Sequence, residues 1–140
     1  MDINITIVPE AVRIARPETK PQVLGALAGC LADVYGLDAD EVLDGLETRE
    51  ALGSTGFGRG MAIPHCRDPR VRKPTLAVLR LDQPVDFAAA DAQPVSLVFG
   101  LVSPENAGAT HLHALAAISR LMLDETKLQA LADAGDAEGL

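Results

Sequence analysis

Apolar residues that recur at helical spacing predict two helices in the first third of the chain. Between Lys20 and Tyr35 they gather on one face, and Gly36 suits the left-handed turn that ends many helices. Asp38 is suited to cap a second helix that runs through Leu46. Cys30 falls within the first pattern and is expected in the core. The apolar positions of the two helices are Val23, Leu24, Leu27, Leu31, Val34, Val42, Leu43 and Leu46.

Strand patterns divide into alternating runs and continuous apolar runs. Residues 75–81 alternate apolar with polar side chains and predict a strand. Residues 95–102 are nearly all apolar, which predicts a central strand buried on both faces. Short strands are expected at Val12–Ala15 and at residues 61–63. Residues 2–8 also alternate and predict a strand or an ordered arm.

Two more helices are expected after a loop at residues 104–110. One runs from about Thr110 to Leu123, and Asp124 opens a last one over residues 125–134. Because strands and helices interleave irregularly, the pattern predicts the α+β class, with helices over the faces of a mixed central sheet. The length of 140 residues indicates a single domain, residues 1–140.

Composition and charge argue against several classes of function. The formal net charge of −8 opposes binding to phosphate backbones, so no nucleic-acid partner is expected. No apolar run approaches the roughly 20 residues that span a bilayer, so no membrane insertion is expected. Two cysteines make no disulfide framework, and the N-terminus carries no export signal, which indicates a cytoplasmic protein.

The stretch between Arg49 and His65 concentrates the residues that suit chemistry. Four glycines fall within eight residues, and glycine lets backbone N–H groups approach an anion closely. A short apolar run, Pro64 and His65 follow. A lone histidine is more often structural, but here its neutral ring could accept a phosphoryl group. The residues expected to bind that group are Gly53, Ser54, Thr55, Gly56 and Gly58.

Other side chains could complete such a site. Arg49 could place its guanidinium on phosphoryl oxygens, although at a helix end it is equally a solvated residue. His111 and His113 lie near the start of the third expected helix, whose N-terminus favours anions. Because they are about 200° apart around a helix, only one faces a ligand, and His111 is favoured. Residues 67–74 form either an exposed loop or a basic rim for an anion.

Competing motifs fit less well. Gly53 and Gly58 have the spacing of a Walker loop, but its lysine and its serine or threonine are replaced by arginine and glycine. The glycines also miss the dinucleotide-binding spacing. A metal site built from His65, Cys66 and His111 has suitable residue types but no paired-ligand spacing. Neither a metal nor a cofactor is therefore expected.

The same residues resemble a known family. The stretch Arg49-Glu-x-x-Gly-Ser-Thr-Gly-x-Gly-x-Gly-x-Ala-Ile-Pro-His65 is similar to the active-site signature of the enzyme IIA proteins of the fructose–mannitol class of the bacterial phosphotransferase system. The resemblance is closest to their nitrogen-regulatory branch. It continues through Asp91-x-Gln-Pro-Val-x-Leu97 to Thr110-His111-Leu112-His113, and covers roughly residues 9–134.

The resemblance implies a three-layer α/β/α sandwich around a mixed sheet. It also implies a phosphotransferase in which His65 is phosphorylated by an HPr-like histidine phosphocarrier, with Arg49 and His111 lining the phosphohistidine. A nitrogen-branch member would then bind regulatory protein targets, such as kinases or ion transporters, according to its phosphorylation state.

Two alternatives stay open. A fructose- or mannitol-type enzyme IIA would pass the phosphoryl group to a IIB domain, and a binding module would use the anion loop without chemistry. The absence of a fused IIB domain or membrane segment favours the regulatory branch. Cys66 stands where the nitrogen branch often has glycine, so a redox-sensitive neighbour of His65 is expected. The chain ends where relatives usually continue, so the last helix is expected to be truncated.

Overall fold

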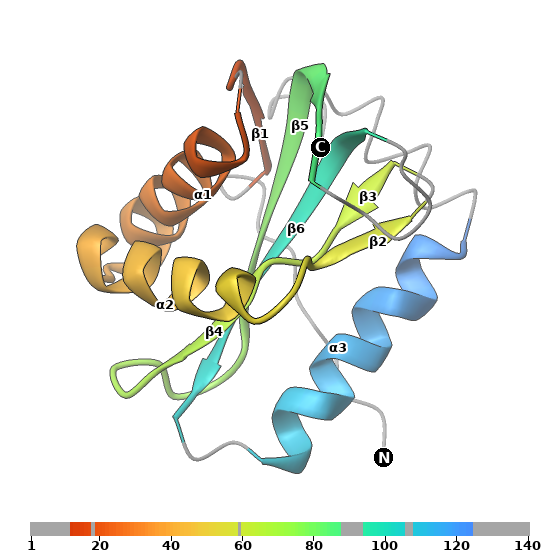
Figure 1. The fold of residues 1–140 in the computed structure, drawn as a ribbon. Coiled ribbons are helices and arrows are strands. Elements are labelled where there is room, and N and C mark those ends of the chain that lie inside the picture. The colour runs from red at the N-terminus through yellow and green to blue at the C-terminus, as the bar shows by residue number, and fades with distance from the viewer. Residues whose placement is uncertain (1–11, 18, 59, 88–93, 106–107, 125–140) are drawn as a thin grey trace.

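The computed structural model describes residues 12–17, 19–58, 60–87, 94–105 and 108–124. The expected segments at residues 2–8 and 125–134 lie outside this described part. Helices and strands follow one another in this order (Figure 1): β1 Val12–Ala15, α1 Lys20–Tyr35, α2 Ala39–Ala51, β2 Gly56–Gly58, β3 Met61–Ala62, β4 His65–Asp68, β5 Thr75–Val85, β6 Val95–Pro104 and α3 Ala109–Met122.

All six strands of the described part of the chain belong to one mixed sheet. Its strand order is β1-β5-β6-β3-β2, and β4 pairs with β6 beyond the end of β3. β5 runs antiparallel to β6, whereas β3 and β4 both run parallel to it. β6 is the predicted central strand, with its residues from Val98 to Ser103 buried. The mixed sheet expected from the interleaved pattern is therefore confirmed.

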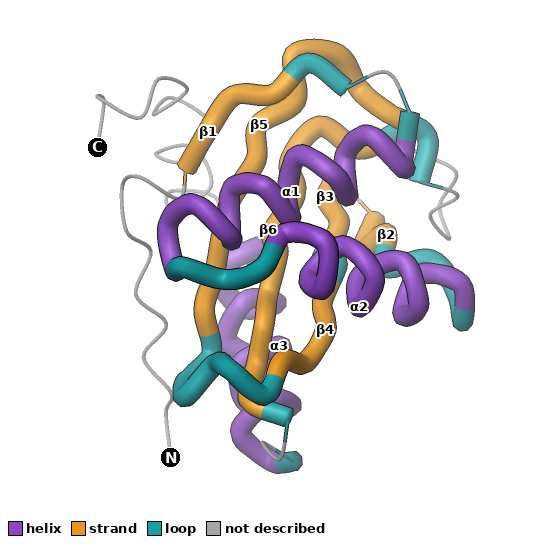
Figure 2. Tube along the Cα trace, turned by 90° about the vertical axis from the view of Figure 1, so that its left-hand side faces the viewer, coloured by secondary structure: helices purple, strands orange, loops and turns teal. Residues whose placement is uncertain are grey.

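Helices cover both faces of this sheet (Figure 2). The core against α1 and α2 contains Val98 and Val102 of β6, while the core against α3 contains Phe99 and Leu101. Neighbouring residues of a strand point to opposite faces, so one apolar strand serves both cores. The three-layer α/β/α sandwich is confirmed. Within the described residues, no helix combines the length and hydropathy needed to cross a bilayer.

The helix boundaries follow the capping residues that the sequence offers. Gly36 ends α1 with a φ of 70°, and the Asp38 carboxylate accepts the backbone N–H groups of Asp40 and Glu41 at the start of α2. α2 continues beyond its predicted end at Leu46 to Ala51. Its last turn is polar and so lacks apolar periodicity, but contacts with the following loop hold it.

Two segments that the sequence predicted as loops contain strands in the structure. The basic stretch after His65 begins with β4, whose four residues pair with β6 from Leu101 to Pro104. Part of the glycine-rich segment forms β2, antiparallel to β3. In both cases backbone hydrogen bonds to a neighbouring strand create the element. Such backbone pairing does not require apolar and polar side chains to alternate, so the sequence pattern did not predict these strands.

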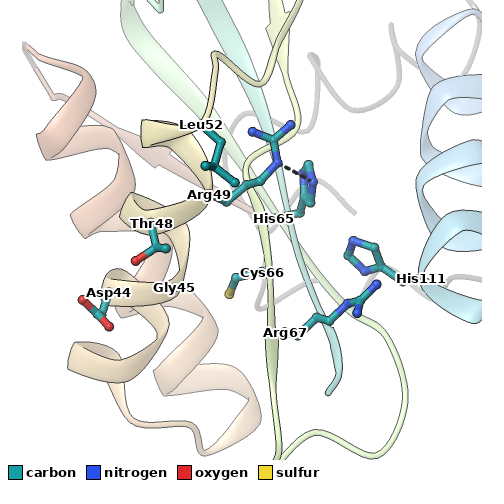
Figure 3. A pocket seen from close by; sticks show the side chains of 9 residues that line it. All are labelled: Asp44, Gly45, Thr48, Arg49, Leu52, His65, Cys66, Arg67 and His111. Atoms are coloured by element: carbon teal, nitrogen blue, oxygen red, sulfur yellow. Dashed lines mark hydrogen bonds between the residues drawn. The ribbon is translucent and has the colours of Figure 1, made fainter. Parts of the chain in front are cut away.

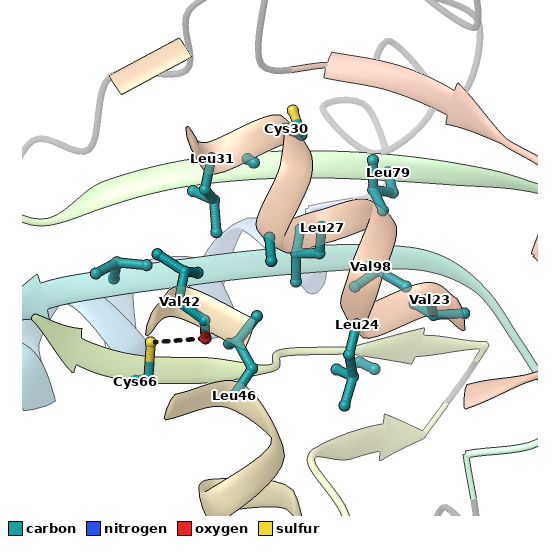
Figure 4. Close-up of a cluster of buried hydrophobic side chains, with 14 of the residues drawn as sticks. Val23, Leu24, Leu27, Cys30, Leu31, Val42, Leu46, Cys66, Leu79 and Val98 are labelled. Atoms are coloured by element: carbon teal, nitrogen blue, oxygen red, sulfur yellow. Dashed lines mark hydrogen bonds between the residues drawn. The ribbon is translucent and has the colours of Figure 1, made fainter. Parts of the chain in front are cut away.

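The contact between α1 and β6 depends on the absence of a side chain at Gly100. A Cβ atom placed there would lie 2.4–2.6 Å from the side-chain carbons of Leu27, a fully buried residue of α1. Figure 4 shows Leu27 among the buried side chains between α1 and β6. Glycine at this position therefore sets how closely the helix approaches the central strand.

We expect Gly100→Ala to lower the free energy of unfolding by about 1–3 kcal/mol, because the added methyl group overpacks the core. Gly25→Ala is the matched control, since nothing lies within 4 Å of a Cβ atom there. In a helix interior this control change is expected to raise stability by about 0.5–1 kcal/mol. Urea denaturation measures both, and equal stability of the two variants would contradict the prediction.

Candidate active site

His65 opens β4 immediately after a break in the strand. Ile63 and Pro64 separate β3 from β4, yet their backbone groups remain bonded: Ile63 N donates to Thr55 O at 3.0 Å, and Pro64 O accepts from Leu101 N at 3.0 Å. His65 is half-buried and pairs in register with Leu101. The two residues before His65 are therefore each held by a backbone hydrogen bond, to Thr55 and to Leu101, which positions the imidazole.

Two hydrogen bonds define the state of the His65 ring. Its Nδ1 lies 2.8 Å from the carbonyl oxygen of Ile63, and a carbonyl only accepts, so Nδ1 carries the proton. Nε2 is then the unprotonated nitrogen, and it accepts from Arg49 Nε at 3.2 Å. Burial lowers the pKa of His65 below its usual 6.5, and the charges of Arg49 and Arg67 lower it further, against the opposing effects of the Ile63 carbonyl and the Glu50 carboxylate. The ring is therefore neutral at pH 7, with its lone pair on Nε2.

Arg49 reaches this nitrogen from the last turn of α2. Its Nη1 donates to the carbonyl oxygen of Gly53 at 2.9 Å, which fixes the guanidinium at the helix end. A cation in the last turn also suits the negative end of the helix dipole. The structure thus brings Arg49 and His65 together as the sequence predicted.

His111 approaches from the other side of the sheet. It lies in the first turn of α3, is 6% exposed, and its ring centroid is 5.3 Å from that of His65. Its Nδ1 lies 2.7 Å from the Oγ of Ser103, a buried residue of β6, so Nε2 remains for a ligand. Burial first, and then His65 and Arg67, lower its pKa to about 4. His113 is exposed and is not among the residues that line the pocket with His65, so only one of the two histidines faces it.

Arg67 belongs to the same pocket, although the sequence indicated it only as part of a basic rim. It lies two residues after His65 on β4, so both side chains are on the same side of the strand. Figure 3 shows Arg67 beside His111, with Arg49 beside His65. A prediction that residues 65–68 form a strand would have placed Arg67 beside His65. The pocket has a volume of about 550 Å³ and is lined by Asp44, Gly45, Thr48, Arg49, Leu52, His65, Cys66, Arg67 and His111.

The glycine-rich segment does not line this pocket. Thr55 gives both its N–H and its hydroxyl to the Glu50 carboxylate, and the Ser54 hydroxyl donates to the carbonyl oxygen of Phe87. The carbonyl of Gly53 accepts from Arg49. These groups are engaged within the protein, and phosphate binding by residues 53–58 stays a prediction.

Cys66 packs on the opposite side of β4 from His65. It is buried, and a Cβ atom on Gly45 of α2 would lie 3.0 Å from the Cys66 Cβ. Burial, with a smaller effect of Asp68, raises the pKa of the thiol to about 12. Because the thiolate is the reactive form, this environment does not support the expected redox sensitivity. Across the described residues, no group of three His, Cys, Asp or Glu side chains could hold a metal ion.

A family profile described as "Phosphoenolpyruvate-dependent sugar phosphotransferase system, EIIA 2" matches residues 7–140. The chain belongs to this EIIA 2 family. It is 42% identical over 141 residues to a nitrogen regulatory protein of Bradyrhizobium diazoefficiens, which covers 100% of this chain and 92% of that relative. It is 36% identical over 119 residues to the fructose-specific EIIA component of Haloferax volcanii, over 84% of this chain and 77% of that one.

The EIIA 2 fold is also found in a similar solved structure. The crystal structure of the nitrogen regulatory protein IIA-Ntr of Neisseria meningitidis matches this chain with a TM-score of 0.83 and 34% identity. The match covers 94% of this chain and 91% of that chain. The family that the signature ending at His65 predicted is therefore confirmed.

The low pKa of His111 predicts a loss of stability in acid. Its pKa is about 4 in the folded protein, against about 6.5 in an unfolded chain, so the unfolded state binds the proton more tightly. The stabilising contribution is fully present above pH 6.5 and is lost as the pH falls toward 4. We therefore expect wild type to lose more stability between pH 7 and pH 4.5 than His111→Gln, measured by urea denaturation. Equal losses would contradict the pKa assigned to His111.

Proposed function

We propose that this protein is a phosphoryl carrier and that Nε2 of His65 holds the phosphoryl group. The observation that carries the proposal is the state of the ring. The Ile63 carbonyl holds the proton on Nδ1, and the lone pair of Nε2 is directed toward Arg49 in an open pocket. A neutral nitrogen with a directed lone pair is what nucleophilic attack on phosphorus requires.

The transfer step conserves atoms and charge. The Nε2 lone pair attacks the phosphorus of a phosphohistidine on the donor protein, a new N–P bond forms, and the old N–P bond breaks with its electron pair returning to the donor ring. Phosphoryl transfer depends mainly on positioning and on stabilising charge on three equatorial oxygens. The Arg49 guanidinium, already at Nε2, needs to move only from the nitrogen to those oxygens.

His111 and Arg67 would stabilise the product from the opposite side. A phosphohistidine adds about −1.5 to −2 charges beside them, by analogy with other phosphorylated side chains. A nearby anion favours the protonated form of an imidazole. His111, neutral in the free protein, would then take up a proton and donate to a phosphoryl oxygen.

The donor is proposed to be an HPr-like histidine phosphocarrier, and the output is proposed to be regulatory. Leu52, at the edge of the pocket, is 82% exposed and Leu112, next to His111, is 64% exposed, which suits docking of a protein partner beside the site. The greater identity to a nitrogen regulatory protein than to a fructose-specific component favours regulation over transfer to a IIB domain.

The direct test is phosphorylation with phosphoenolpyruvate, enzyme I and an HPr-like phosphocarrier. We expect acid-labile phosphate on wild type, located at His65 by mass spectrometry under non-acidic conditions, and none on His65→Ala. Phosphorus and nitrogen NMR should place the phosphoryl group on Nε2. Uptake that survives in His65→Ala, or a wild type that binds phosphate but is never phosphorylated, would overturn the proposal.

Arg49 provides a second prediction about the same reaction. We expect Arg49→Ala to slow phosphorylation of His65 by about 10²–10³-fold, the usual cost of losing a positioned transition-state donor. Arg49→Lys should recover only part of this, because lysine keeps the charge but not the paired donors. Arg72→Ala, an exposed arginine outside the pocket, is the matched control. Rapid-quench kinetics measure the rates, and a rate for Arg49→Ala equal to that of the control would refute the role.

A further inference from the structure

Glu50 is a nearly buried carboxylate next to Arg49 in the last turn of α2. Its side chain is 6% exposed. It accepts from the Thr55 N–H at 2.8 Å and the Thr55 hydroxyl at 2.7 Å, and pairs with Lys20 Nζ at 2.8 Å. Lys20, in the first turn of α1, also lies 5.1 Å from the ring centroid of Phe87. One carboxylate therefore joins the start of α1, the end of α2 and the loop that follows it.

Thr55 connects this carboxylate to His65 by two routes. Along the first, the chain turns between Glu50 and Thr55 and presents the Gly53 carbonyl to Arg49, whose Nε then donates to Nε2 of His65. Along the second, the Thr55 carbonyl accepts from Ile63 N, and the Ile63 carbonyl accepts from Nδ1 of His65. Both hydrogen bonds that define the ring state thus trace back to Thr55.

We propose that Glu50 is a positioning residue for phosphoryl transfer: by holding Thr55 it fixes both hydrogen bonds that orient the His65 imidazole. The inference rests on the proposed role of His65 as phosphoryl acceptor. A buried ion pair is by itself weak support for stability, because desolvation offsets much of the attraction. A carboxylate that accepts two donors from one residue does, however, hold that residue in a single geometry.

The test uses two variants and a matched control. Glu50→Gln keeps the shape but loses the charge and replaces one of the two acceptor oxygens by an amide donor. Thr55→Val keeps the shape and the charge balance and loses the hydroxyl. Glu47→Gln changes an exposed carboxylate on the same helix. We expect the first two to slow phosphorylation of His65 by about 10–100-fold, the scale of a small misplacement of reacting groups. Glu47→Gln should behave as wild type.

Two readouts separate positioning from a merely structural role. In an Arg49→Ala background, Thr55→Val should cost a smaller factor in rate than in wild type, because one of its two routes is already lost. In the free protein at neutral pH, nitrogen NMR should show wild-type His65 protonated on Nδ1. In Glu50→Gln and Thr55→Val it should show a mixture with the Nε2–H tautomer.

Each outcome decides the inference. Variants that unfold at a lower temperature but keep the wild-type tautomer and rate would overturn it, as would equal rate losses with and without Arg49. The tautomer is measured without any phosphate donor. A wild type that accepts no phosphoryl group would therefore refute the proposed function, while the tautomer comparison would still judge the role of Glu50.

Discussion

The imidazole of His65 lies between a hydrogen-bond acceptor and a hydrogen-bond donor, and the site depends on this arrangement. The Ile63 carbonyl can only accept and the Arg49 guanidinium can only donate, so the two together permit one neutral tautomer. Two acceptors would hold a proton on each ring nitrogen, and no free lone pair would remain. Two donors would leave the single proton of the neutral ring without an acceptor to define its position. The lone pair on Nε2 follows from these two partners and not from the ring alone.

The sheet makes this arrangement possible by the way it ends around β4. Pairing of β4 with β6, after the break at Ile63 and Pro64, places His65 and Arg67 on the α3 side and Cys66 on the α2 side. Arg49, at the C-terminal end of α2, reaches the same ring that His111 approaches from the start of α3 (Figure 3). Two helices on opposite layers therefore contribute to one pocket.

Two arginines place positive charge in this pocket, although the chain as a whole is negatively charged. The formal net charge is −8, yet Arg49 and Arg67 flank two histidines that burial and these cations keep unprotonated. A neutral ring is nucleophilic, and the two arginines supply the positive charge beside it. An arriving phosphoryl group would reverse the local balance, since its charge exceeds that of either arginine. A change of this size at the pocket would let other proteins distinguish the two phosphorylation states.

The sequence by itself determined most of the local structure and the identity of the central residues. The sequence predicted three features that each depend on neighbours in the chain. They are the caps at Gly36 and Asp38, the apolar run of β6, and the signature from Arg49 to His65. The tertiary structure alone decided that polar residues 65–68 form a strand, that α2 extends to Ala51, and that Glu50 holds Thr55. Those features arise from pairing with distant backbone and from buried polar contacts, which leave no periodic pattern in the sequence. For the same reason the proton on Nδ1 of His65 could be located only once Ile63 and Arg49 were placed around the ring.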